Sequence, residues 1–216
     1  MHKGLSPNIL LQSYTAERLP VIAEMLNITT GLLDKMLSSQ TKKSVMDRSD
    51  ERLKMLGVNY RTSPIVVDEY SRTEPMSAYG NLDQGVLVAG DRAPDAPGLV
   101  LVADGTETRL FDVFSPTYHT VLVFTPDASV TTNILEVLRE YPRDVIKPVI
   151  ILPQGTTVGE VVDVVVDRDG HAYRGYLVAG GEQKVVVIRP DGVTGAIVHG
   201  AEGVRAYFDK IFLKSP

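Results

Sequence analysis

Histidine and aspartate are the residue types of this chain that could bind a metal ion, but their spacing does not suit one. The histidines are His2, His119, His171 and His199. No two of them lie four residues apart beside a carboxylate, as a metal-binding helix face requires. Asp163, Asp167 and Asp169 resemble part of a calcium-binding loop, but no glutamate follows at the spacing of an EF-hand. We therefore expect no metal site.

Loops that bind phosphate through glycine backbone groups are also missing. No Gly-x-Gly-x-x-Gly follows a predicted strand, and no glycine-rich loop ends in Lys-Ser or Lys-Thr. The segment from Gly155 to Gly159 has glycine at both ends but no lysine, so we interpret it as the end of a strand. Because a pyrophosphate needs a glycine-rich loop at a helix N-terminus, we expect no dinucleotide to bind to this chain alone. We assign no cofactor-binding residue.

The chain contains no cysteine. This excludes a disulfide framework, a thiolate zinc site and an iron–sulfur cluster. It also excludes reactions whose nucleophile is a thiolate. Any fold that normally uses thiols must therefore serve another purpose here.

The composition is that of an ordinary globular protein, and the length of 216 residues fits one medium-sized domain with an appendage. The formal net charge of -5 argues against a nucleic-acid partner, because phosphates require a basic face. No apolar run approaches the ~18 residues that span a bilayer. The N-terminus also lacks the apolar core of a signal peptide. We expect a cytoplasmic protein with no membrane partner.

The elements that would position these residues fall into three zones. Residues 8–45 are predicted to be helical, because apolar side chains recur near the 3.6-residue period. Pro20 is expected to begin a turn of this helix or to kink it. Residues 46–98 are irregular and rich in proline and glycine, with one short strand candidate at 65–67. A segment this long without regular structure is expected to wrap another surface as an extended arm.

Residues 99–213 alternate between strands and helices. Strands are predicted at 99–102, 121–124 and 145–152, and a hairpin is predicted from 184–188 and 193–198 around Arg189-Pro190-Asp191-Gly192. The segment 108–114 is a short helix or turn, and 161–166 could be strand or helix. Helices are expected after Asp127, which can cap one, and at the C-terminus. The fully apolar strand 121–124 is expected to be buried on both faces.

This order of elements matches a thioredoxin-like α/β domain with a central sheet of four or five strands. In a redox thioredoxin the thiols lie between the second strand and the next helix, which corresponds to residues 124–130 here. Thr125 and Ser129 cannot replace a thiolate. We therefore expect no thiol or peroxide reductase activity. A thioredoxin- or peroxiredoxin-type oxidoreductase is a remote alternative that the lack of cysteine disfavours.

Several motifs, in order along the chain, resemble those of FAD-dependent aromatic hydroxylases of the phenol hydroxylase-like group. Residues 13–23, Ser-Tyr-Thr-Ala-Glu-Arg-Leu-Pro-Val-Ile-Ala, are similar to a segment in the last helices of the family's FAD domain. Residues 56–64 resemble its linker. Residues 90–96, Gly-Asp-Arg-Ala-Pro-Asp-Ala, resemble the signature that opens its C-terminal thioredoxin-like domain. Three further segments match later parts of that domain: 108–112, 119–124 and 187–192. The motifs resemble those of fungal members most.

The resemblance implies three regions. Residues 1–45 would be a helical remnant of the FAD domain's closing helices, 46–90 an extended linker, and 91–216 the thioredoxin-like domain. The full-length family uses FAD and NAD(P)H, but its dinucleotide motifs lie upstream and are absent here. The resemblance therefore implies a non-catalytic structural or dimerisation module, in a truncated form, and no catalytic residue is carried over.

An alternative function is a stand-alone interaction protein that docks onto a separately encoded flavin monooxygenase domain. In both cases the apolar stripe of helix 8–45 lacks an evident cover. This stripe contains Ile22, Met25, Leu26, Leu32, Leu33, Met36 and Leu37. Because large uncovered apolar patches mark interfaces, we expect self-association through this helix or binding to an FAD-domain partner.

Overall fold

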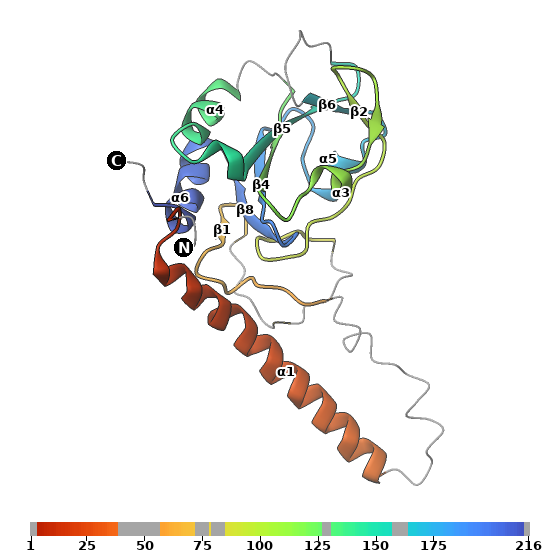
Figure 1. The fold of residues 1–216 in the computed structure, drawn as a ribbon. Coiled ribbons are helices and arrows are strands. Elements are labelled where there is room, and N and C mark those ends of the chain that lie inside the picture. The colour runs from red at the N-terminus through yellow and green to blue at the C-terminus, as the bar shows by residue number, and fades with distance from the viewer. Residues whose placement is uncertain are drawn as a thin grey trace.

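Strand β4 (His119–Phe124) lies at the centre of the fold, and every one of its residues is buried. The computed structural model describes residues 4–38, 57–71, 78, 85–126, 131–156 and 164–213 (Figure 1). Within this part, β4 pairs in parallel with β5 (Ile146–Pro153) and antiparallel with β7 (Lys184–Ile188). The prediction that 121–124 is a deeply buried strand is confirmed.

The order of elements around β4 is that of a thioredoxin-like domain. Helix α4 (Thr132–Leu138) and the short 3-10 turn Arg143–Val145 connect β4 to β5. Helix α5 (His171–Gly175) precedes β7, which forms a hairpin with β8 (Thr194–Val198), and helix α6 (Ala201–Ile211) follows. The predicted α/β fold class is confirmed. The expected capping residue Asp127 lies outside the described residues.

The sheet is larger than the four or five strands that the sequence suggests. It has eight strands in the order β1-β8-β7-β4-β5-β6-β2-β3. Strand β2 (Leu99–Leu101) matches the strand predicted at 99–102. The linker adds β1 (Val67–Asp68), and the two-residue strand β3 (Glu107–Thr108) is not expected from the sequence. The ambiguous segment 161–166 contributes β6 (Val164–Asp167), which pairs in parallel with β5. Two-residue strands leave no periodic signal in a sequence, which explains the low expected count.

Apolar side chains of β4 alternate between two layers of core. Val121 and Val123 face α4 and α6, where they pack with Tyr207 and Phe208. Leu122 and Phe124 face the opposite side, which α5 and the short helix α3 (Leu110–Val113) cover. Figure 1 shows these two helix pairs on opposite faces of the sheet. Burial on both faces explains why β4 is apolar throughout.

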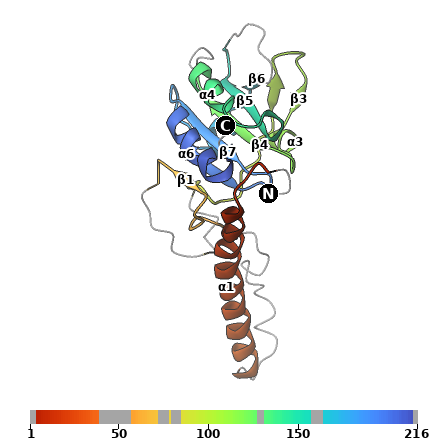
Figure 2. The same cartoon turned by 60° about the vertical axis from the view of Figure 1, so that its left-hand side comes forward.

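Helix α1 (Leu11–Ser38) follows a 3-10 turn at Asn8–Leu10 and extends away from the sheet (Figures 1 and 2). It continues through Pro20 without a break. The predicted end at residue 45 lies outside the described residues. In the described part of the chain, no helix is both long enough and apolar enough to cross a membrane.

The linker lies against the domain in its described parts. Strand β1 joins the sheet beside β8, which agrees with the strand candidate at 65–67 shifted by two residues at its start and one at its end. Residues 88–94 run along the β7–β8 hairpin, where the Gly90 N–H donates to the Thr194 carbonyl at 2.7 Å and the Ala93 N–H to the Gly192 carbonyl at 3.0 Å. The backbone therefore attaches this irregular segment to the sheet.

Candidate functional site

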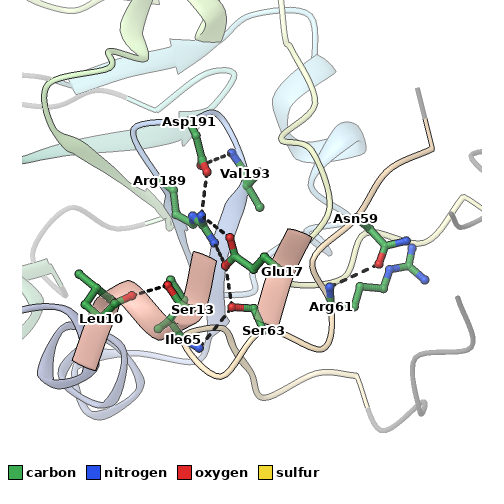
Figure 3. Close-up of polar contacts among 10 residues, drawn as sticks. All are labelled: Leu10, Ser13, Glu17, Asn59, Arg61, Ser63, Ile65, Arg189, Asp191 and Val193. Carbon is green, nitrogen blue, oxygen red and sulfur yellow. Dashed lines mark hydrogen bonds and ion pairs between the residues drawn. The ribbon is translucent and has the colours of Figure 1, made fainter. Parts of the chain in front are cut away.

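The most elaborate polar site joins α1 to the tip of the β7–β8 hairpin. Arg189 donates two hydrogen bonds to the Glu17 carboxylate, from Nη1 to Oε1 at 2.6 Å and from Nη2 to Oε2 at 3.1 Å (Figure 3). Ser63 of the linker donates to Glu17 Oε1 at 2.7 Å. The side chains of Glu17 and Arg189 are only 7% and 11% exposed. Three distant parts of the sequence therefore meet at one carboxylate.

The hairpin turn orients the Arg189 side chain toward α1. The Gly192 N–H donates to the Arg189 carbonyl at 2.9 Å, and Gly192 has a φ of 79°, a conformation that glycine adopts without strain. Asp191 accepts the Val193 N–H at 3.3 Å, and its other carboxylate oxygen accepts Arg189 Nη2 at 2.7 Å. The Pro-Asp-Gly sequence thus orients the guanidinium as well as reversing the chain.

Aromatic stacking extends this junction. The guanidinium carbons of Arg18 and Arg189 lie 5.7 and 5.8 Å from the centre of the Tyr60 ring. At such distances a ring attracts a cation by about 0.5–1 kcal/mol at an exposed site. Tyr60 belongs to the linker, so it links α1 and the hairpin a second time.

Electrostatics keep Arg189 charged in spite of its position. Burial disfavours its charged form, but the hydrogen bonds to Glu17 and the attraction of Asp191 and Glu17 outweigh that cost and raise the pKa of Arg189. Such a fully paired group is neither a nucleophile nor a proton donor at neutral pH. The junction therefore attaches α1 to the domain and does not provide a catalytic group.

A tyrosine lies at the carboxyl ends of β4 and β5, beside the described start of the segment 124–130. The Tyr173 hydroxyl donates to the carbonyls of Ile151 at 3.0 Å and Thr125 at 3.3 Å, which lie at the carboxyl ends of β5 and β4. Thr125 is buried, and Ser129 lies outside the described residues. Burial and the Asp167 charge raise the pKa of Tyr173 to about 12. This edge therefore presents a neutral phenol that is already hydrogen-bonded.

The histidines that the structure describes lie apart from one another. His119 is buried against the rings of Tyr207, Phe208 and Phe212. His171 begins α5 and contacts Arg174, and His199 packs on Tyr70 after β8. His2 lies outside the described residues, and within them no group of three or more His, Asp or Glu side chains could hold a metal ion.

The remaining sequence candidates serve local structure. Asp167 accepts the Tyr173 N–H at 2.9 Å, and Asp169 forms an ion pair with Arg168 at 3.4 Å. Asp163 lies outside the described residues. Gly155 turns the chain directly after β5, as the sequence predicts for a strand end, while 157–159 lie outside the described residues.

The described residues do not fit the pyrophosphate of FAD. The strand–glycine–helix unit at Gly200, between β8 and α6, is the arrangement most similar to a phosphate loop. A carboxylate already occupies its entrance, because Glu69 accepts the His199 N–H at 2.7 Å. Glu202 adds a second negative charge in the first turn of α6. A phosphate group would be repelled there, so no site for FAD follows from these residues.

The α1–hairpin junction was not predicted from the sequence. Glu17 and Arg189 were each singled out within a motif, but no local pattern pairs residues so far apart. A signal was present in the helix itself: Ser13, Glu17 and Val21 recur every four residues on one face, and all three are buried. Two polar residues on a buried face indicate partners elsewhere in the chain.

Comparison with known proteins finds one curated relative and several solved structures. No family model matches this chain. A flavin-dependent monooxygenase of Mycobacteroides abscessus is 32% identical over 129 residues, which are 60% of this chain and 22% of that protein. This relative and the two solved structures described below are flavin-dependent monooxygenases. The chain thus spans about a fifth of the length of its curated relative.

Two solved structures share the fold over nearly the whole chain. Aklavinone-11 hydroxylase, solved with FAD and aklavinone, has a TM-score of 0.64 at 16% identity and covers 97% of this chain, which matches 36% of the hydroxylase. The flavin-dependent monooxygenase PieE, solved with FAD and substrate, has a TM-score of 0.60 at 16% identity. The match covers 97% of this chain and 40% of PieE. At such identities the likeness establishes the fold.

Proposed function

We propose that this chain is the non-catalytic C-terminal module of an FAD-dependent aromatic hydroxylase of the phenol type, similar in style to fungal members, with a structural and dimerisation role. FAD and NAD(P)H would act in the rest of such an enzyme. The similarity to a flavin-dependent monooxygenase over 129 residues supports the family. The lack of cysteine supports the absence of thiol chemistry in the module itself.

The main support for the interaction role is that α1 has a buried side and an exposed apolar side. The exposed leucine and isoleucine side chains of α1 fall within roughly 80° of the helix circumference when successive residues are spaced by about 100°. We call this set the outer stripe; it consists of Leu11 (60% exposed), Leu19 (63%), Ile22 (49%), Leu26 (55%), Leu33 (55%) and Leu37 (77%). The buried residues Ser13, Glu17 and Val21 lie on the opposite side of the helix. An apolar stripe that faces away from its own domain is typical of a binding surface.

Light scattering on the purified chain tests this role. We expect the wild-type chain to form dimers or larger assemblies, and Leu26→Asp with Leu33→Asp to shift it to monomer, because two buried charges would oppose an apolar interface. Ala16→Asp with Asn27→Asp is the matched control, since both residues are exposed and lie beside the stripe rather than on it. Circular dichroism confirms that α1 still forms. A monomeric wild-type chain at micromolar concentration would contradict self-association.

The transcript separates this proposal from the alternative that the chain is a stand-alone interaction protein. The outer stripe serves both functions equally well. Reading the transcript upstream of Met1 decides between them: a continuous frame that encodes Gly-x-Gly-x-x-Gly supports the module, and an in-frame stop codon supports the separate protein.

A further inference from the structure

A cavity lies between the linker and the end of α5, outside the junction described above. Its volume is about 350 Å³, within the range of roughly 300–1,000 Å³ typical of small-molecule sites. It is lined by two linker segments, around 57–61 and 85–94, and by Arg174, Gly175 and Leu177. We propose that this cavity binds a small amphiphilic anion, with a carboxylate, sulfonate or phosphate group on an apolar body.

Charge in this cavity is positive although the chain as a whole is negative. The charged residues that line it are Arg61, Arg92, Arg174 and Asp91. Asp91 is fully engaged by Arg61, through Nε to Oδ1 at 2.6 Å and Nη2 to Oδ2 at 2.9 Å, and it also accepts the Val88 N–H at 3.0 Å. Arg92 and Arg174 have no acidic partner among the described residues. Two guanidinium groups are therefore available to an anion.

Arg174 is held in place before any ligand arrives. Its Nη2 donates to the Asp169 carbonyl at 2.9 Å and lies 3.0 Å from His171 Nδ1. An immobilised guanidinium loses little conformational freedom on binding, which favours affinity. Both contacts use Nη2, so donors on the other guanidinium nitrogens are left for a ligand.

The linker wall of the cavity is also rigid. Gly90 has a φ of 101°, and a Cβ there would lie 2.4 Å from the Arg61 backbone nitrogen. The Tyr60 N–H donates to the Gly90 carbonyl at 2.8 Å, and the Thr194 N–H to the Asp91 carbonyl at 2.8 Å. This close approach of two backbones holds the two linker segments of the wall together.

The apolar body of the ligand would contact exposed aliphatic side chains. Leu177 has a φ of 53°, in the left-handed region, at the end of α5 where glycine or asparagine is usual. Its side chain is 45% exposed on the cavity wall, and that of Val86 is 58% exposed. Residues held in rare backbone conformations cluster at ligand sites, so an exposed leucine of this kind on the wall supports the proposal.

Titration of the full chain with anilinonaphthalene sulfonate and with its uncharged parent, phenylnaphthylamine, tests the proposal. We expect saturable binding of the sulfonate that weakens by about tenfold or more in Arg92→Gln with Arg174→Gln, since each charge-assisted hydrogen bond adds substantially to affinity. The neutral probe should bind more weakly, and its binding should not change in that variant. Arg139→Gln, an exposed arginine outside the cavity, is the matched control and should bind as the wild type does.

Changes in the amide chemical shifts of the wild-type chain locate the bound probe without the need for a variant. The cavity glycines Gly57, Gly85 and Gly175 should shift with the sulfonate. The proposal is overturned if there is no saturable binding, if the shifts lie only on the outer stripe, or if the neutral probe binds as tightly as the anion. It is also overturned if the arginine variant keeps its fold and binds like the wild type. Should that variant not fold, the wild-type shifts and the neutral probe decide.

Discussion

At the scale of single residues, the Glu17–Arg189 pair is the contact on which the position of α1 depends most. A buried ion pair adds little net stability over an apolar pair, but removing one member leaves an uncompensated charge in a poorly solvated place. Without Glu17, Arg189 would keep only its contact with Asp191, a half-exposed carboxylate that accepts Nη2 at 2.7 Å, and Ser63 would lose its acceptor. Replacing both residues together should therefore cost little stability, whereas replacing one of them alone should cost much.

Glu17→Ala should lower the free energy of unfolding by about 3 kcal/mol, the usual cost of breaking a buried pair. Urea denaturation at neutral pH measures this change. Joint replacement of Glu17 and Arg189 by Met should restore most of the loss. Glu140→Ala is the control, because Glu140 pairs with Arg205 at the surface and such pairs contribute at most about 1 kcal/mol. A loss from Glu17→Ala as small as that of the control would contradict the assigned role.

His119 should make stability depend on pH. Burial among aromatic rings, and the positive charge of Arg189, lower its pKa from 6.5 to about 4 in the folded chain. Between these values the unfolded chain binds the proton and the folded chain does not. The contribution of His119 to the free energy of unfolding is therefore fully present above pH 6.5. It is lost as the pH drops toward 4, by about 3 kcal/mol in total.

Urea unfolding of the wild type and His119→Phe across this range measures the effect. The difference between their slopes with pH isolates His119, since phenylalanine fits the aromatic surroundings and does not titrate. His171→Gln is the control because His171 is exposed. Equal slopes for wild type and His119→Phe would show that His119 is not the group responsible.

At the scale of elements, the sequence predicts best what is periodic and long. The long strands and helices α1 and α6 follow from apolar patterns that tertiary structure leaves intact. Strand β3 does not, because its two residues are extended only through pairing with a neighbour, and the bounds of β1 are shifted from the candidate at 65–67 for the same reason. The sequence predicts an apolar stripe along α1, and the structure places four of its members, Ile22, Leu26, Leu33 and Leu37, in the outer stripe.

The candidate site was less predictable than the fold. Arg189-Pro190-Asp191-Gly192 was recognised as a hairpin turn, and the structure adds that the turn orients a guanidinium toward a helix 172 positions away in sequence. The cavity between the linker and α5 depends on the left-handed backbone at Gly90 and Leu177. Neither a long-range pair nor a backbone conformation of this kind leaves a local signal.

At the scale of the whole molecule, no described region suits FAD, so the purified chain should be colourless. Dialysis against excess FAD, followed by measurement of visible flavin absorption, checks this expectation. The Mycobacteroides abscessus monooxygenase, treated in the same way, is the positive control. Flavin retained at close to one per chain would show that the carboxylates near Gly200 do not exclude a pyrophosphate.

Strand β1 also affects the solubility of the molecule. Unpaired backbone groups on the outermost strand of a sheet can recruit strands from other molecules. The linker covers β8 on that side, where Val67 and Asp68 pair with Ala196 and Ile197 and the Glu69 N–H donates to the Ile197 carbonyl at 2.9 Å. Without β1, the edge of the buried strand β8 would lie open to strands of other molecules. We expect the linker to limit edge-to-edge association as well as to connect α1 with the domain.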